Sequence, residues 1–194
     1  MLVVTMGPMF SGKTSQLIAF TELLTRLGRT WVAFKYDKDR RYQDGAMSEI
    51  VSHDGKRINA VPIGNWSQIE DYVCYLEHKW GKRPGYILID EAQFIFGARS
   101  ACMKTQHFTR HNHYYYVYGL DQWADGMPCE RMSVLASFAN DVRKNKTVCK
   151  ICHSKEATMT YKHSGSGKRE EIGGEELYWP VCPVCWYNLM GEKQ

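Results

Sequence analysis

The chain has 194 residues, a formal net charge of +4 at pH 7 and seven cysteines. This length suits one sizeable hydrophobic core with a small additional domain, and the weak, evenly spread positive charge gives no reason to expect a nucleic-acid partner. No apolar run is long enough to cross a bilayer, and a motif that begins at residue 7 leaves no room for an N-terminal signal sequence. We therefore expect a soluble, cytoplasmic protein without a membrane partner.

The first predicted elements are a short strand over residues 2–6 and a helix over residues 13–27, joined by a glycine-rich turn that fits G-x-x-x-x-G-K-[ST] at every defined position. Such a turn directs backbone N–H groups at phosphate oxygens, and the following helix presents its positive end to them. Lys13 is predicted to contact the β- and γ-phosphates and the Thr14 hydroxyl to hold magnesium. The predicted phosphate-binding residues are Gly7, Pro8, Met9, Phe10, Ser11, Gly12, Lys13 and Thr14.

Apolar strands alternate with helical patterns along the following residues. Strands are predicted over residues 30–35, 50–52, 60–63, 86–89 and 114–120, and helices over residues 66–79, 98–110 and 132–140. A polar turn at residues 53–55 separates the two short strands. This alternation predicts an α/β fold with a parallel sheet flanked by helices. The composition changes at about residue 144, so we predict a nucleotide-binding domain over residues 1–144 and a second domain over residues 145–194.

The strand over residues 86–89 ends in two carboxylates, Asp90 and Glu91. In an open parallel sheet the ligand lies beyond the carboxyl ends of the strands, so both side chains are expected beside the nucleotide. Asp90 is suited to hold magnesium, and Glu91 is placed to act on whatever attacks the γ-phosphate. A water molecule as the attacking group would indicate an ATPase, whereas a substrate hydroxyl would indicate a kinase.

The second domain contains two C-x-x-C pairs, which is the arrangement by which two knuckles bind one tetrahedral zinc ion. The predicted ligands of this structural zinc are Cys149, Cys152, Cys182 and Cys185. His153 is an alternative ligand, although a solvated side chain is the simpler interpretation. Residues 162–174 are rich in Gly, Ser, Lys and Glu and predict an exposed loop between the pairs.

The remaining cysteines and the basic segment before the zinc ligands are assigned structural roles. Cys74, Cys102 and Cys129 lack a partner at ligand spacing and are expected to pack in the core. The basic residues at 143–146 are expected to form a solvated link into the zinc domain.

Together these motifs resemble the thymidine kinases of the cellular, tetrameric type. The segments that carry the resemblance lie in order along nearly the whole chain: Gly7-Pro8-Met9-Phe10-Ser11-Gly12-Lys13-Thr14, Lys35-Tyr36-x-Lys38-Asp39-x-Arg41-Tyr42, Ser52-His53-Asp54-Gly55, Ile89-Asp90-Glu91-Ala92-Gln93-Phe94, Gly119-Leu120-Asp121, the four cysteines, and Ile172-Gly173-Gly174-x-x-x-Tyr178. Each piece is common among nucleotide-binding proteins, but the ordered set is specific.

The resemblance implies a RecA-like nucleotide domain, a small zinc domain, a homotetramer, and transfer of the γ-phosphate of ATP to the 5′-hydroxyl of thymidine or deoxyuridine in nucleotide salvage. It implies that Glu91 is the general base and that residues 171–178 form a loop that covers the base and binds it largely through main-chain groups. The implied ATP contacts are the phosphate loop, Asp90 and Gln93; the implied magnesium ligands are Thr14, Asp90 and Asp54; and the implied nucleoside contacts are Met9, Phe94, Leu120, Trp123, Glu171, Ile172, Gly173, Gly174 and Tyr178.

One stretch departs from the family pattern. After residue 121 the family commonly has an aromatic residue on the base and then a Pro-Phe pair, but Ala124 and Cys129 occupy the aromatic places here. Either Trp123 supplies the stacking surface from the neighbouring position, or the pocket is wider and accepts a different or modified base.

Two competing interpretations stand beside the kinase site. For Tyr178, the competing role is packing in the core of the zinc domain. For the whole chain, the competing class of function is a nucleic-acid-stimulated ATPase, because a RecA-like core with a zinc knuckle also occurs in repair proteins and helicases.

Overall fold

The computed structural model describes residues 1–39, 48–104 and 113–191. Its centre is a six-stranded sheet in the order β5-β2-β6-β7-β1-β8, in which every neighbouring pair is parallel. The strands are β1 (Leu2–Met6), β2 (Trp31–Tyr36), β5 (Val61–Ile63), β6 (Tyr86–Ile89), β7 (Tyr114–Gly119) and β8 (Asp141–Lys144). The predicted α/β fold with a parallel sheet is therefore confirmed.

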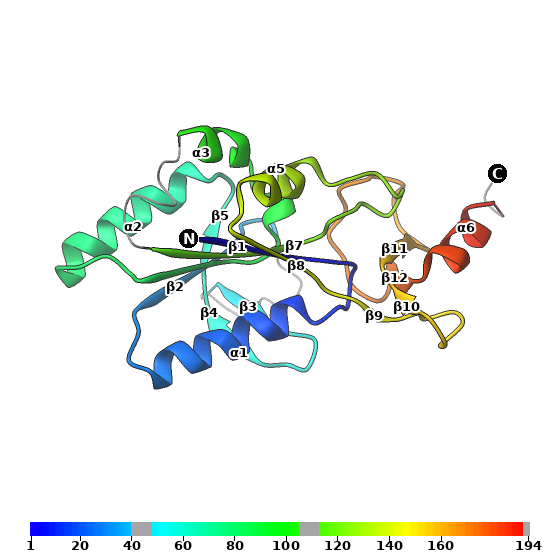
Figure 1. Cartoon of the computed structure of the whole chain (residues 1–194), viewed down its shortest axis with the longest axis horizontal. Helices are drawn as coiled ribbons and strands as arrows, with labels where there is room; N and C mark the ends of the chain where they lie inside the picture. Colours follow the sequence, from blue (N-terminus) through cyan, green and yellow to red (C-terminus); the bar gives the residue numbers. More distant parts are fainter. Residues whose placement is uncertain (40–47, 105–112, 192–194) are drawn as a thin grey trace.

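Helices cover both faces of the sheet (Figure 1). On one face α1 (Lys13–Arg26) packs through Leu17, Ile18 and Leu24. The other face carries α2 (Ser67–Trp80), α3 (Ala98–Lys104), α5 (Glu130–Phe138) and the short 3₁₀ helix η1 (Ala92–Phe94). Successive strand residues alternate between these two cores, which explains why the central strands are nearly continuous apolar runs.

Several predicted elements differ from those observed in the structure. The strand expected over residues 50–52 is β3 (Glu49–Val51), and it pairs antiparallel with β4 (Arg57–Asn59), which was not predicted. The residues at 143–144, expected in a solvated link, belong to β8, which pairs with β1 at the edge of the sheet. That assignment was wrong because residues 142–144 are exposed, so β8 lacks the apolar run that marks a buried strand. The expected helix over residues 98–110 is described to residue 104; its remainder, and the motif residues Arg41 and Tyr42, lie outside the described residues.

The C-terminal part is built from two small hairpins and a helix. β9 (Thr147–Val148) pairs with β10 (Glu156–Ala157), β11 (Met159–Lys162) pairs with β12 (Tyr178–Val181), and α6 (Pro183–Gly191) follows. These elements share a separate core around Tyr161, Val181 and Trp186. The chain between β11 and β12, residues 163–177, is called the β11–β12 loop below. Among the described residues, no helix has the length and apolar character needed to cross a membrane.

Candidate active site

The turn between β1 and α1 has the geometry of a phosphate-binding loop. A Cβ atom on Gly7 would lie 2.5 Å from the main-chain oxygen of Asn145, and Gly7 has φ +153°, so only glycine fits. Gly12 has φ 75° and caps the N-terminus of α1. The Lys13 ammonium group is buried and donates to the carbonyl oxygens of Gly7 (3.0 Å) and Pro8 (2.7 Å). The loop therefore folds around the lysine that the motif assigns to phosphate binding.

The two predicted magnesium ligands Thr14 and Asp90 meet in the structure. The Thr14 hydroxyl donates to Oδ2 of Asp90 at 3.0 Å. The two residues follow β1 and β6, which are not neighbours in the sheet because β7 lies between them. Asp90 is buried, with 6% of its surface exposed. The adjacent Glu91 has φ 52°, a left-handed conformation that is strained for a residue with a side chain. Strain of this kind is typical of functional sites.

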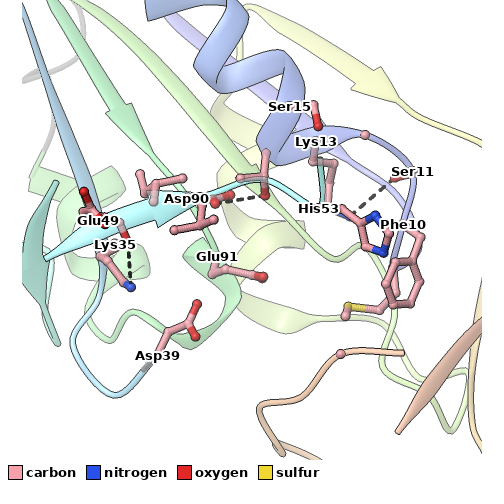
Figure 2. A pocket seen from close by; sticks show the side chains of 16 residues that line it. Phe10, Ser11, Lys13, Ser15, Lys35, Asp39, Glu49, His53, Asp90 and Glu91 are labelled. Carbon is pink, nitrogen blue, oxygen red and sulfur yellow. Dashed lines mark hydrogen bonds between the residues drawn. The ribbon is translucent and has the colours of Figure 1, made fainter. Parts of the chain in front are cut away.

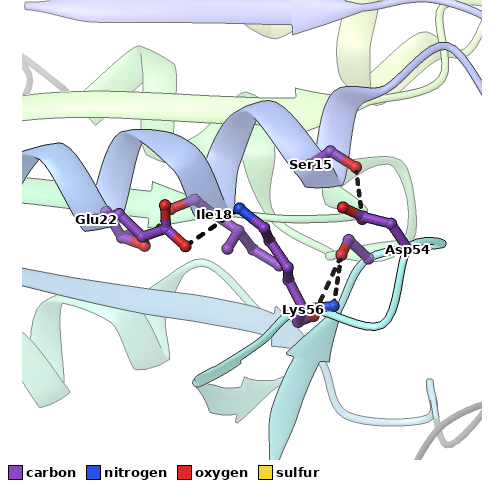
Figure 3. A network of polar contacts seen from close by, with 7 residues as sticks. Ser15, Ile18, Glu22, Asp54 and Lys56 are labelled. Carbon is purple, nitrogen blue, oxygen red and sulfur yellow. Dashed lines mark hydrogen bonds and ion pairs between the residues drawn. The ribbon is translucent and has the colours of Figure 1, made fainter.

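The third predicted magnesium ligand, Asp54, lies in the exposed turn between β3 and β4. Its Oδ1 accepts a hydrogen bond of 3.4 Å from Ser15, the neighbour of Thr14 (Figure 3). Hydrogen bonding from Ser52 is the main cause that lowers the pKa of Asp54 below its ordinary value. The same turn is joined to α1 by an exposed ion pair between Lys56 and Glu22, 3.4 Å long.

The phosphate loop opens into a first pocket in front of the carboxyl ends of the strands (Figure 2). Besides residues 9–14 of the loop, its lining residues are Ser15, Lys35, Asp39, Glu49, Ile50, Val51, His53, Asp90, Glu91 and Gly174. Lys35 and Asp39 are buried, and the Lys35 ammonium donates to the main-chain oxygen of Glu49 at 2.9 Å. Neither residue was predicted as part of the site. Their position at the carboxyl end of β2 could have indicated it, because ligands of open parallel sheets lie beyond the carboxyl ends of the strands.

A second pocket adjoins the first and shares lining residues with it. Its lining residues are Met9, Glu91, Gln93, Phe94, Leu120, Trp123, Ala124, Thr160, Arg169, Glu171, Ile172, Gly173 and Tyr178. This set contains every predicted nucleoside contact except Gly174, which lines the first pocket. Met9 and Glu91 line both pockets, so the Glu91 carboxylate stands where the two meet.

The walls of the second pocket are aromatic and apolar on the sheet side. Trp123 is buried, with 3% of its surface exposed, and its ring lies 5.9 Å from that of Phe94, measured between centroids. Gln93, predicted as an ATP contact, lines this second pocket instead. Thr160 was not predicted; its hydroxyl accepts a hydrogen bond of 3.0 Å from the Met9 backbone and so joins β11 to the phosphate loop.

The β11–β12 loop forms the opposite wall through Glu171, Ile172 and Gly173. The Tyr178 hydroxyl donates to the main-chain oxygen of Glu171 at 2.6 Å, and the Tyr178 backbone N–H donates to the carbonyl oxygen of Gly174 at 3.0 Å. Tyr178 thus lines the pocket and also fixes the shape of the loop.

The C-terminal part of the chain contains a cluster of four cysteine side chains. The Sγ atoms of Cys149, Cys152, Cys182 and Cys185 lie within 4.8 Å of one another. The Cys152 and Cys182 sulfurs are 3.9 Å apart, close to the roughly 3.8 Å that a tetrahedron of zinc–sulfur bonds of about 2.3 Å requires. Hydrogen bonding from the Ser154 backbone is the largest cause that lowers the pKa of the Cys152 thiol to about 6, whereas burial is the largest cause that raises the pKa of the Cys185 thiol to about 12. Donor set and spacing fit zinc.

The remaining thiols and the neighbouring histidine lie apart from this cluster. His153 is exposed, and within the described parts of the chain the cluster consists of the four cysteines. Cys102 and Cys129 are buried as expected, and burial raises the pKa of each thiol to about 11. Cys74 is exposed, so its predicted place in the core was wrong.

Comparison with known proteins assigns this arrangement to a family. The family model for thymidine kinase matches residues 1–186. A thymidine kinase of Pseudothermotoga lettingae is 31% identical, with 99% of this chain and 97% of that protein aligned. A thymidine kinase of Myxoma virus is 29% identical over 93% of both chains, and thymidine kinase 1 of Dictyostelium discoideum is 28% identical over 97% of this chain and 78% of its own. A full-length match at this identity, together with the site described above, means that the chain belongs to the thymidine kinase family.

Proposed function

We propose that the chain transfers the γ-phosphate of ATP to the 5′-hydroxyl of thymidine or deoxyuridine and so produces the 5′-monophosphate for nucleotide salvage. The observation that carries this proposal is the position of Glu91, which lines both the phosphate pocket and the second pocket. A general base must lie within hydrogen-bond reach of the proton that it accepts. A nucleoside in the second pocket with its 5′-hydroxyl at the junction would meet this requirement.

In the proposed reaction the first pocket binds the phosphates. The loop backbone and Lys13 bind the β- and γ-phosphates, and Thr14 and Asp90 would hold magnesium, with Asp54 as a further candidate. When bound, magnesium would neutralise negative charge that develops on the phosphate oxygens. Glu91 accepts the proton of the attacking hydroxyl.

In the second pocket the base would lie between the apolar wall and the β11–β12 loop. Leu120 and Trp123 supply apolar surface on one side, and the main chain at Ile172 and Gly173 lines the other. Because backbone groups offer both donors and acceptors, the loop can bind the polar edge of a pyrimidine without a dedicated side chain. Trp123 is the proposed substitute for the aromatic residue that position 124 lacks.

The zinc ion would fix both ends of the β11–β12 loop. β11 follows the first cysteine pair and β12 leads directly into the second, so one metal holds the supports of a loop that must open for substrate and close against water. We further propose a division into residues 1–144 and 145–194, a homotetrameric assembly and a cytoplasmic location. The last two rest on the resemblance to the cellular, tetrameric type of the family.

The test is transfer of radiolabel from the γ-position of ATP to a panel of deoxynucleosides, with release of free phosphate recorded with and without single-stranded DNA. Label on thymidine or deoxyuridine supports the proposal, and the rest of the panel defines the base specificity. Release of free phosphate alone, stimulated by DNA, would replace the proposal by a nucleic-acid-stimulated ATPase in which Glu91 activates water.

A further inference from the structure

The orientation of the Glu91 carboxylate is set by a buried amide. Gln93 is fully buried, and its Oε1 lies 3.1 Å from the backbone nitrogen of Leu120. A backbone N–H can only donate, so the amide oxygen must face Leu120 and the amide nitrogen must face the other way. There Nε2 donates to Oε2 of Glu91 at 2.5 Å. The side chain of Gln93 therefore fixes the direction of the carboxylate.

The main chain of Gln93 is held in turn by an arginine from α5. Nη1 of Arg131 donates to the Gln93 carbonyl oxygen at 2.6 Å, and the guanidinium lies 4.3 Å from the centroid of the Phe96 ring. The same Nη1 pairs with the Glu170 carboxylate on the β11–β12 loop at 3.2 Å. One guanidinium thus joins α5, the short helix η1 after Glu91, and the loop that covers the second pocket.

We infer that Arg131 is a positioning residue that couples closure of the β11–β12 loop to the orientation of Glu91, acting through Gln93. This inference rests on the proposed function, in which Glu91 is the base and the loop closes over the nucleoside. The ion pair with Glu170 holds the Arg131 guanidinium in the position from which it also donates to the Gln93 carbonyl oxygen. Opening of the loop removes that restraint and loosens η1, which needs outside support because Glu91 at its start has a strained backbone.

The chain offers a matched control for this coupling. A second ion pair, between Arg169 and Asp125, is 2.7 Å long and also joins the β11–β12 loop to the body of the protein. It reaches the segment after β7 instead of η1. Loss of either pair favours the open loop, whereas loss of the Glu170 pair should additionally disturb Gln93 and Glu91.

The experiment compares Glu170→Gln with Asp125→Asn in two measurements. The first is steady-state kinetics with thymidine. Exposed ion pairs are worth about a two- to fivefold effect, so both variants should raise KM by about that factor. Asp125→Asn should leave kcat unchanged, whereas Glu170→Gln should also lower kcat by a similar factor. The second is hydrogen–deuterium exchange, which should become faster in the peptide containing residues 91–94 for Glu170→Gln and not for Asp125→Asn. A conservative Glu170→Asp change should restore part of both effects.

The coupling is refuted if the two variants change kcat and KM in the same way. It is also refuted if hydrogen–deuterium exchange at residues 91–94 is unchanged in Glu170→Gln. Exchange is measured without turnover. If the wild-type chain phosphorylates no nucleoside, the proposed function fails, but the exchange measurement still decides whether the β11–β12 loop and η1 are coupled. Both substitutions keep the size of an exposed side chain, so neither variant is expected to lose its fold.

Discussion

Replacement of Glu91 by glutamine is the most direct test of the proposed chemistry. The substitution removes the ability to accept a proton but keeps the size of the side chain. The amide oxygen of the new side chain can accept the same hydrogen bond that Gln93 Nε2 donates at 2.5 Å in the wild type. The second pocket should therefore keep its shape, and both substrates should still bind.

The expected loss is in turnover. A positioned general base contributes about 10²- to 10⁴-fold, which corresponds to about 2.7–5.5 kcal/mol of transition-state stabilisation. For Glu91→Gln we expect kcat to fall by at least about 10², with KM for thymidine and ATP and the melting temperature nearly unchanged. Steady-state kinetics and thermal unfolding measure these quantities on one preparation.

Glu22→Gln is the matched control. Glu22 lies on α1 after the phosphate loop, where its carboxylate makes only an exposed 3.4 Å contact with Lys56 among the described ion pairs, so the same chemical change should leave kcat unaltered. Turnover of Glu91→Gln within about tenfold of the wild type would remove Glu91 from the role of base, since a tenfold effect is below the range for general base catalysis.

Three further predictions concern the metal, the base pocket and the phosphate loop. The purified chain should contain about one zinc ion per molecule, and chelation should make the C-terminal part sensitive to protease and abolish activity; full activity without metal would contradict a structural zinc. Trp123→Ala should raise KM for thymidine far more than KM for ATP, because its buried ring lines the second pocket, whereas parallel rises with a lower melting temperature would indicate general destabilisation. Gly7→Ala should abolish ATP binding in calorimetric titration, since the added Cβ would lie 2.5 Å from the Asn145 oxygen; Gly12→Ala, with no atom within 4 Å, should cost only the strain of its positive φ.

The parts of the site that could be predicted from sequence are those in which chemistry demands fixed spacing. Backbone capture of phosphate requires glycines at set intervals, and tetrahedral zinc requires paired thiolates, so sequence spacing alone predicted the turn between β1 and α1 and the gathering of the four cysteines. The placement of Asp90 and Glu91 at the carboxyl end of β6 could be predicted because a buried parallel strand gives a clear apolar run, and ligands of open parallel sheets lie beyond the carboxyl ends.

The parts that could not be predicted depend on tertiary contacts. β8 has the polar sequence of a linker because a strand at the edge of a sheet buries few of its side chains. Its pairing with β1 becomes evident only in the assembled sheet. The role of Gln93 depends on two partners, Glu91 and Leu120, of which the second is 27 residues away. Thr160 reaches Met9 from 151 residues away, a contact that no local pattern encodes.

The hairpin beneath the β11–β12 loop has a consequence for how the substrate range of such a chain can change. Lys162 and Tyr178 are paired across β11 and β12, so the two ends of the loop are already adjacent before the loop itself is ordered. The entropy of closing a loop grows only with the logarithm of its length, and doubling the length costs only about 0.6 kcal/mol. Insertions, deletions or replacement of the residues between these ends can therefore reshape the cover of the second pocket at little expense in stability.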